Sequence, residues 1–324
     1  MVVDKVLTHN TDNMEVLDEH LEFKKFEEPI VLQLGGSDPE TLAKATKIVH
    51  QYGYDEVNLN AGCPSCKVAG LGEFGAALIK RPFVIKSCLE AMGAAAPIKV
   101  SLKTRLGVDE LDSKEYFSSM MDSVLSSNLP AAADFSVVVH ARKAWLKGLS
   151  PAQNRSVPPL DYERAFDVCG SKQNLRWYLN GGISTLEEAV NLFERAPSNM
   201  EGVMMGRAAM NTPCVFAHTD VLLYGEDSNP ATAYSRRSLL EAYCEYIHDK
   251  YVVPDDSIVT TGQIFQAVKP LLGVFHGHKG NRQWRSALDK LSRSEDMRRE
   301  YGIAGIIEQV MKDIDWEILD AKLV

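Results

Sequence analysis

The sequence has few cysteines, no excess of positive charge and no long apolar run. Six cysteines occur in 324 residues, and only Cys63 and Cys66 lie close together, as Cys-Pro-Ser-Cys. Sparse cysteine is typical of a reducing, intracellular compartment, either cytoplasm or an organelle. Residues 1–10 lack the apolar core of a secretory signal. No apolar run reaches the roughly 18 residues that a membrane helix needs, so no membrane association is expected.

The formal net charge of −9 argues against a globally basic nucleic-acid binder, although a local basic patch stays possible. Hydrophobic residues make up 45% and charged residues 24%, which are ordinary values for a globular protein. The length fits one large domain or two medium ones, with a sizeable core. The sequence leaves the oligomeric state open, with a monomer as the default expectation.

Short β-rich runs alternate with helical patterns in the first two thirds of the chain. The predicted strands are 30–34, 56–60, 98–103, 135–140, 177–180 and 202–205. Helices are expected at 41–52, 83–92 and 186–193. Such alternation predicts a parallel sheet covered by helices, and largely apolar strands suit a sheet that is buried on both faces.

The pattern changes after Gly225. Residues 226–232 form a polar stretch with Pro230, which suits a linker. Helices are expected beyond it at 234–251, 263–275, 282–291 and 303–314, with an interruption at Lys269-Pro270. We therefore predict an α/β domain over 1–225 and a helical domain over 233–324.

The number of strands leaves the sheet type open. Six full strands are visible, and Met1-Val2-Val3 is the possible stub of another. A closed (β/α)₈ barrel needs eight strands. Either the sheet is open, or the chain begins inside a barrel.

Polar residues gather where the predicted strands end. They are Gln33, Asn58, Asn60, Lys103, Arg105, His140, Arg142, Asn180 and Arg207. In α/β folds the ligand site lies at the carboxyl ends of the strands. One such residue is usually a solvated loop residue or a capped strand end, but six consecutive strands with this feature indicate a shared site.

Glycines after the last two strands suggest a phosphate site. Gly181-Gly182 allows close backbone approach, and residues 184–187 (Ser-Thr-Leu-Glu) predict a capping box that opens a helix. Gly206-Arg207 adds another glycine and a cationic donor. Loops after the final two barrel strands often bind phosphate at a helix N-terminus. The alternative is an ordinary left-handed turn before a helix.

Cys63 follows the second full strand in Asn60-Ala-Gly-Cys-Pro. Its possible roles are nucleophile, proton donor, half of a redox pair, or buried core thiol. The flanking Gly and Pro favour an exposed turn, and Gly70, Gly72 and Gly75 would let the loop move as a lid. The Cys63/Cys66 spacing fits a redox pair, but the thioredoxin-like context is absent. No second cysteine pair completes a zinc site, and His276-Gly-His278 suits a solvated loop, so no metal site is expected.

Two segments are rich in basic residues. His140–Lys147 is followed by a Pro-rich polar stretch that contains Arg155. Residues 276–299 contain seven Lys or Arg and three Asp or Glu, a local charge of +4. Trp145 and Trp284 lie among these basic residues, and aromatics in such company suit stacking on nucleic-acid bases. The alternative is a solvated helix face.

Together these motifs resemble the tRNA-dihydrouridine synthases. The motifs are Leu32-Gln-Leu-Gly-Gly-Ser-Asp-Pro, Asn58-Leu-Asn-Ala-Gly-Cys-Pro-Ser, Lys103-Thr-Arg, His140-Ala-Arg-Lys-Ala-Trp, Asn180-Gly-Gly and Gly206-Arg. Residues 140–160 and 272–288 resemble the A-type subfamily, which acts on position 20 or 20a of the tRNA D-loop. The resemblance covers residues 1–295. It implies an FMN-binding TIM barrel followed by a helical tRNA-binding domain.

The resemblance also implies a chemistry. NADPH reduces FMN, which delivers hydride to C6 of a flipped-out uracil, while Cys63 protonates C5. Gln33 and Lys103 match contacts to the flavin ring, and His140 matches an FMN contact near the phosphate. The residues that match phosphate-side contacts are Asn180, Gly181, Gly182, Gly206 and Arg207. Those that resemble tRNA-contacting residues are Asn60, Arg142, Asn154, Arg282 and Arg285.

The start of the chain departs from the family pattern. Family members open with a strand that carries a Pro-Met motif, then a helix, then a strand resembling Thr-Glu-Met. Here Met1 matches the end of that second strand, so we expect about 30–40 residues of the barrel to be missing. Two other functions stay open: a non-catalytic tRNA-binding form, and another FMN-barrel oxidoreductase that acts on a free pyrimidine.

Overall fold

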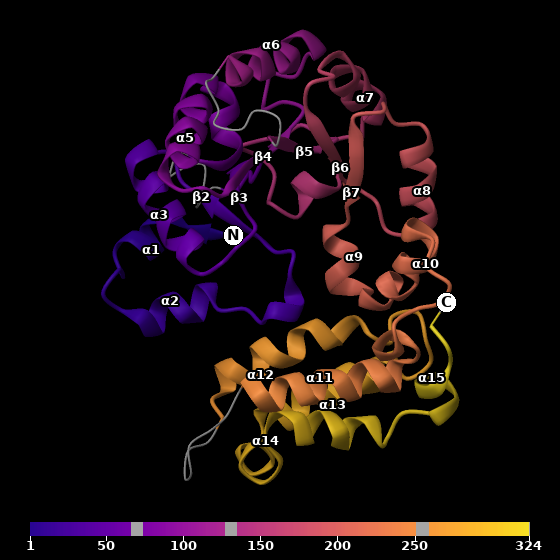
Figure 1. Cartoon of the computed structure of the whole chain (residues 1–324). Helices are drawn as coiled ribbons and strands as arrows, with labels where there is room; N and C mark the ends of the chain where they lie inside the picture. The colour runs from indigo at the N-terminus through magenta and orange to yellow at the C-terminus, as the bar shows by residue number, and fades with distance from the viewer. Residues whose placement is uncertain (66–73, 127–134, 251–258, 324) are drawn as a thin grey trace. The chain divides into compact units, whose positions relative to one another are not determined.

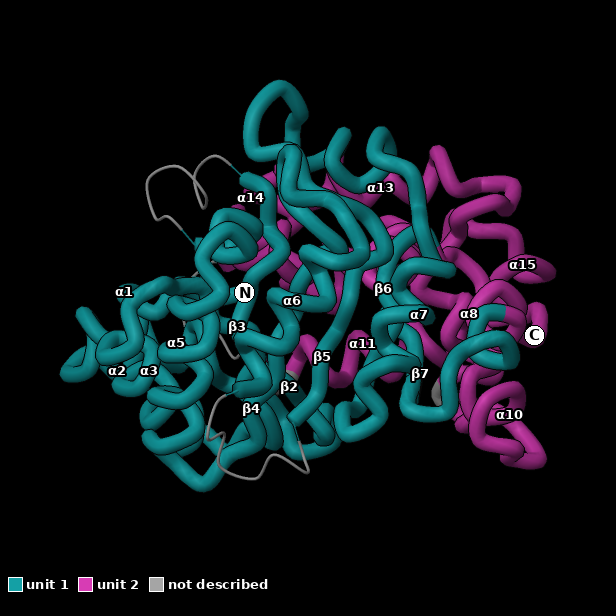
Figure 2. The backbone as a smooth tube through the Cα atoms, turned by 90° about the horizontal axis from the view of Figure 1, so that it is seen from above, with its two compact units in different colours: residues 1–182, 192–204 teal, residues 183–191, 205–324 magenta. Residues whose placement is uncertain are grey.

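The computed structural model describes residues 1–65, 74–126, 135–250 and 259–323. Cys66, Gly70 and Gly72 lie outside the described residues, and with them the predicted redox pair and lid. The described residues form two compact units (Figure 2). The first consists of residues 1–182 and 192–204, and the second of 183–191 and 205–324. The domain limits predicted from the sequence, 1–225 and 233–324, stay predictions.

One parallel sheet of seven strands runs through the first unit, in the order of the sequence. The strands are β1 (Val2–Val3), β2 (Val31–Gly35), β3 (Glu56–Ala61), β4 (Lys99–Arg105), β5 (Ser136–His140), β6 (Arg176–Asn180) and β7 (Met200–Met204). Each pairs in parallel with the next, and the stub expected at residues 1–3 is β1, which pairs Val2 with Leu34. This is the arrangement of a TIM barrel, as predicted.

Helices follow the strands along the chain and lie outside them (Figure 1). They are α1 (Asp4–Thr8), α2 (Met14–Leu21), α3 (Pro39–Gln51), α5 (Pro82–Ala95), α6 (Lys114–Leu125), α7 (Tyr162–Ser171) and α8 (Leu186–Glu194), with 3₁₀ turns η1 (Lys25–Glu27), η2 (Gly75–Lys80) and η4 (Gln153–Arg155). Asp38 shows why α3 begins where it does. Its carboxylate accepts from Thr41 N at 2.8 Å, and Pro39 supplies the first helical φ.

The core of the first unit lies between the strands and these helices. Val57, Leu59 and Leu102 on the strands are buried, as are Leu42 of α3 and Ile85 of α5. Trp177 of β6 meets Phe117 of α6 with ring centroids 6.5 Å apart. One apolar face of the sheet is thus covered by helices, which leaves the opposite face to line the barrel interior.

From residue 205 onward, the described secondary structure of the second unit is helical. The helices are α9 (Gly206–Asn211), α10 (Thr219–Tyr224), α11 (Arg236–Lys250), α12 (Thr261–Val268), α13 (Asn281–Arg293), α14 (Glu295–Met311) and α15 (Trp316–Asp320), with 3₁₀ turns η5 (Pro213–His218), η6 (Ala231–Ala233) and η7 (Lys269–Gly273). The interruption expected at Lys269-Pro270 is confirmed, since α12 ends at Val268 and η7 follows. None of the described helices is long and apolar enough to cross a membrane.

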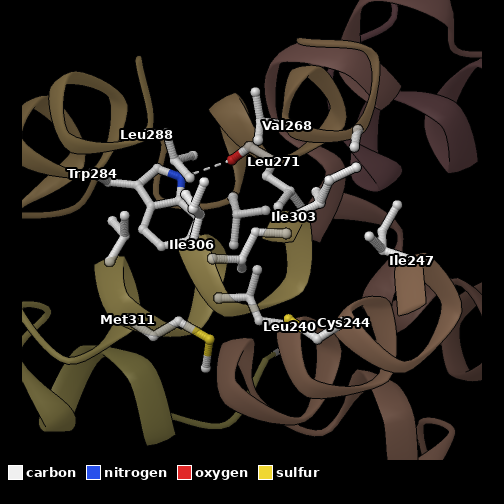
Figure 3. Close-up of a cluster of buried hydrophobic side chains, with 14 of the residues drawn as sticks. Leu240, Cys244, Ile247, Val268, Leu271, Trp284, Leu288, Ile303, Ile306 and Met311 are labelled. Carbon is white, nitrogen blue, oxygen red and sulfur yellow. Dashed lines mark hydrogen bonds between the residues drawn. The ribbon is translucent and has the colours of Figure 1, made fainter. Parts of the chain in front are cut away.

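Trp284 is a core residue of the second unit, so the stacking role suggested by its sequence neighbours is wrong. Its side chain is 0% exposed, its Nε1 donates to Leu271 O at 2.8 Å, and its ring lies 4.8 Å from that of Phe275. Figure 3 shows Trp284 with Leu288, Ile306 and other apolar side chains from α11 to α14. Arg282 and Arg285 are close to Trp284 in sequence, but a helix turns successive residues to different faces. Exposed charges beside Trp284 in sequence therefore do not indicate that Trp284 is exposed.

Candidate functional site

Strand register aligns the predicted polar residues in neighbouring rows. Asn60 pairs with Lys103 across β3 and β4. Arg105 pairs with His140, and His140 with Asn180, across β4, β5 and β6. The residues expected at the strand ends of the first unit are therefore brought to one end of the sheet.

Three amide side chains form a hydrogen-bonded row on β2 and β3. Gln33 Nε2 donates to Asn58 Oδ1 at 2.8 Å, and Asn60 Nδ2 donates to Gln33 Oε1 at 2.9 Å. Asn58 Nδ2 continues the row to Ser101 Oγ on β4, at 2.8 Å. Since both ends of the Gln33 amide are engaged, this row fixes how that side chain is oriented.

Asn60 also holds the loop that carries Cys63. Its Oδ1 accepts from the backbone N–H groups of Gly62 and Cys63, each at 3.0 Å. Cys63 O in turn accepts from Ala76 N at 2.9 Å, which ties the loop to η2. The Cys63 side chain is half-buried and forms no disulfide with any of the described cysteines. The same asparagine thus connects the amide row to the thiol loop.

Lys103 is the cation of this row. Its Nζ donates to Asn180 Oδ1 at 2.9 Å, and Asn180 Nδ2 donates to Met204 O at 2.7 Å. Burial, assisted by the charge of Arg105, lowers the pKa of Lys103 to about 8. The amine is therefore mostly protonated at neutral pH, and it is held in place by a neutral partner.

Arg105 joins three loops at the same end of the sheet. The side chain is 3% exposed. Its Nε donates to Gly62 O, and its Nη1 donates to Lys143 O and Asn154 O, each at 2.9 Å. A planar guanidinium reaches several carbonyls at once, which a lysine amine on a single stem cannot do in the same geometry.

Two residues predicted to contact tRNA, Asn154 and Arg142, are buried in the first unit. Asn154 is 0% exposed; its Oδ1 accepts from Trp145 N at 2.8 Å, and its Nδ2 donates to Trp145 O at 2.9 Å. Arg142 is buried and donates to Pro158 O. In this arrangement Asn154 shapes the segment 145–154, and the expectation that it touches tRNA directly does not fit its burial. Trp145 itself is half-buried, with Lys143 Nζ 4.2 Å from its ring centroid.

Gly181 and Gly182 form a cradle that side chains would fill. Their φ values are +120° and +76°, in the region that favours glycine. A Cβ on Gly181 would lie 2.5 Å from His140 Cδ2, and one on Gly182 would lie 2.6 Å from Leu160 Cδ1. Tyr162 Oη donates to Gly181 O and holds the turn from the other side. The close packing of His140 and Leu160 against this backbone, together with the positive φ values, therefore requires glycine at both positions.

The remaining predicted residues belong to the second unit. Gly206 and Arg207 are exposed at the start of α9. Arg282 and Arg285 are exposed on α13, whereas Trp284 and Leu288 of the same helix are buried. The capping box predicted for Ser184 and Glu187 is displaced by one residue along the chain.

The cap of α8 uses Thr185 and Glu188. Thr185 Oγ1 accepts from Glu188 N at 3.1 Å, and the Glu188 carboxylate accepts from Ser184 N at 2.8 Å. Both Ser184 and Thr185 are suitable caps, and both 187 and 188 are glutamate, so the sequence alone allowed either register.

Sequence reasoning missed Ser101 and Glu56. Ser101 Oγ, which accepts from Asn58, donates to the Glu56 carboxylate and extends the polar row across β3 and β4. The signal was present as period-two alternation: Glu56, Asn58 and Asn60 share one face of β3, and Ser101 and Lys103 share one face of β4.

Comparison with known proteins identifies the family of the chain. The sequence model of the dihydrouridine synthase family matches residues 1–309. The chain belongs to the dihydrouridine synthase family. It is thus a member of a family of oxidoreductases, and the resemblance seen in the motifs is confirmed.

Curated relatives cover most of the chain. A tRNA-dihydrouridine(20/20a) synthase of Shewanella oneidensis is 38% identical over 84% of this chain and 75% of its own length. One of Xanthomonas axonopodis pv. citri is 38% identical over 92% of this chain and 82% of its own. One of Xanthomonas campestris pv. campestris is 40% identical over 83% and 73%.

Proposed function

We propose that this protein reduces uridine to 5,6-dihydrouridine in tRNA, at position 20 or 20a of the D-loop, with FMN as cofactor and NADPH as reductant. The observation that carries the proposal is the connection made by Asn60. This one side chain binds Gln33, in the row where a flavin ring is expected, and the backbone of Cys63, the expected proton donor. Relatives at 36–40% identity carry the name tRNA-dihydrouridine(20/20a) synthase.

The residues at the strand ends fit FMN. Lys103 offers a cationic donor and Gln33 an oriented amide, both suited to the polar edge of a flavin ring. The cradle of Gly181 and Gly182 beside His140 suits the close approach of a phosphate. The chemistry that a bound FMN supplies is hydride transfer to C6 of uracil, with NADPH as the source of the electrons.

Cys63 completes the reduction in this proposal. Saturation of the C5–C6 bond needs a hydride at C6 and a proton at C5, and the Cys63 Sγ–H supplies the proton. A general acid has to lie within reach of the carbon that it protonates. Asn60 and Arg105 secure this position, because they hold the backbone of residues 62–63 from its N–H and C=O sides.

The helical part of the second unit is proposed to bind the tRNA. Arg282 and Arg285 are exposed on α13, and cationic side chains bind the phosphate backbone. The substrate uracil has to leave its stack to reach a site at the strand ends. Buried Asn60 and Arg142 then act near the flipped base, whereas Asn154 acts through the loop that it organises.

One experiment tests the function as a whole. The protein is reconstituted with FMN and given NADPH with an unmodified tRNA transcript, and dihydrouridine is measured by nucleoside mass spectrometry. We expect dihydrouridine at position 20 or 20a and none in transcripts with cytidine at those positions. Reduction of free uridine as efficient as that of tRNA would instead favour an oxidoreductase for free pyrimidines. Tight tRNA binding without reduction or flavin binding would favour a non-catalytic form.

A further inference from the structure

The second unit contains a cavity of about 310 Å³, and none of the described residues that line it is acidic. Its charged or titratable lining residues are Arg236, Lys322, His276, His278 and Cys214. The other lining residues are Thr212, Val215, Gly273, Val274, Ala321 and Leu323. Arg236 and Lys322 are two fixed cations in this lining, and no Asp or Glu side chain is among the described residues that line the cavity, which points to an anionic occupant.

Arg236 is the central cation of this cavity. It is 7% exposed, its Nε donates to Val274 O at 3.0 Å, and its Nη2 lies 2.7 Å from His278 Nε2. Among the described residues no carboxylate forms an ion pair with it. Burial lowers the pKa of Arg236, as expected for a desolvated cation. Most of its five N–H donors stay available to a ligand.

Groups around Arg236 add a further hydrogen-bond donor and further positive potential. Burial and the neighbouring Arg236 charge lower the pKa of His278. A neutral His278 that accepts at Nε2 carries its proton at Nδ1, so it offers a further N–H. The cavity also lies at the N-terminal end of α11, where the helix dipole adds positive potential.

Lys322 is held at the rim by backbone bonds. Ser235 and Lys322 form an antiparallel bridge, and Leu323 N donates to Tyr234 O at 2.8 Å. The lysine side chain is exposed, so its charge can change without loss of core packing. The cationic rim is therefore anchored to the start of α11 rather than carried by a free tail.

We propose that this cavity is a phosphate-binding pocket, in which the Arg236 guanidinium binds the anion with support from Lys322 and His278. A buried guanidinium with free donors matches the oxygen geometry of phosphate. The phosphate belongs either to an RNA backbone or to a free phosphate compound. The RNA source rests on the proposed function, but the pocket itself does not.

The pocket is tested by calorimetric titration of inorganic phosphate into the full chain with FMN bound, which occupies the flavin phosphate site. Three variants are compared with wild type: Arg236→Met, Lys322→Glu and the control Lys312→Glu, which makes the same change of net charge at an exposed residue that does not line this cavity. We expect saturable binding that weakens about tenfold or more in Arg236→Met and roughly twofold to fivefold in Lys322→Glu. Lys312→Glu should bind like wild type.

Absence of saturable binding to wild type would overturn the proposal, and so would equal binding by Lys322→Glu and Lys312→Glu. The second comparison decides the matter even if Arg236→Met does not fold. Measurements of tRNA affinity distinguish the two sources of the phosphate. A loss of tRNA affinity in Lys322→Glu beyond that in Lys312→Glu assigns the phosphate to RNA, and unchanged tRNA affinity assigns it to a free phosphate compound. Failure of uridine reduction would count against the proposed function but not against the phosphate pocket, whose own test is the phosphate titration.

Discussion

Asn60 Oδ1 accepts a hydrogen bond from Cys63 N at 3.0 Å, while Asn60 Nδ2 donates to Gln33. Asn60→Ala removes both and leaves the N–H groups of Gly62 and Cys63 without this acceptor, at a cost of about 1–3 kcal/mol. We expect kcat for uridine reduction to fall more than tenfold, with a smaller change in KM, because the thiol loses its position rather than its contact with tRNA.

The matched control for this prediction is Asn199→Ala. Asn199 likewise binds backbone groups with its side chain: its Nδ2 donates to the carbonyls of Cys169, Lys172 and Leu175, none of which belongs to the Cys63 loop. It should lower the free energy of unfolding without the selective loss of kcat. Equal loss of kcat in the two variants would show that Asn60 acts only on stability.

The sequence predicted the strands well because their signals are local. Each predicted strand of β2–β7 begins or ends within about two residues of the observed one, as in 56–60 against Glu56–Ala61. Short helices such as α1 and α2 were missed, since a few turns offer too little periodicity. Polar residues at strand ends meet in a parallel sheet whatever the detailed packing, which is why Gln33, Asn60, Lys103 and His140 were found.

What the sequence did not reveal depends on tertiary packing. Trp284 lies between two arginines in sequence, but the helix turns it into the core while they stay exposed. Asn154 lies in a polar, Pro-rich segment, and only the fold shows that its amide is buried against Trp145. The pocket at Arg236 was not predicted at all, because it joins residues from about 212, 236, 276 and 322.

Gly181→Ala should weaken FMN binding strongly. The new Cβ would lie 2.5 Å from His140 Cδ2 at a φ of +120°. Gly148→Ala is the control, since its φ is +82° but no atom lies within 4 Å of the added Cβ. Both should lose about 1–3 kcal/mol of stability from backbone strain. Fluorescence titration with FMN should show reduced affinity in the Gly181 variant alone, and equal affinities would remove the cradle from the cofactor site.

Lys103 should make stability depend on pH. Burial lowers its pKa from 10.5 to about 8 in the folded state, so the unfolded chain binds more protons between these values. The free energy of unfolding of the flavin-free protein should therefore rise with pH across this window, relative to Lys103→Met. The difference is at most about 3 kcal/mol. Denaturation curves at several pH values measure it, and a difference that does not vary with pH would contradict the assignment.

The double variant Arg282→Ala/Arg285→Ala should bind tRNA more weakly. The slope of log affinity against log salt concentration should also become shallower, by the equivalent of up to about two phosphate contacts. The control is Arg293→Ala, since the Arg293 guanidinium is paired with Asp289 on the same helix at 2.9 Å. Filter binding at several salt concentrations gives both quantities. A double variant with wild-type affinity and salt slope would place the tRNA elsewhere.

The most direct test of the account is single-turnover reduction of tRNA by Cys63→Ala with reduced FMN bound. Cys244→Ala, a buried cysteine of α11 that does not line the Arg236 pocket, is the control. The account predicts that Cys63→Ala binds FMN and tRNA like wild type but forms dihydrouridine at least about a hundredfold more slowly, as expected when a general acid is lost. Formation at the wild-type rate would contradict the assignment of Cys63 as the proton donor.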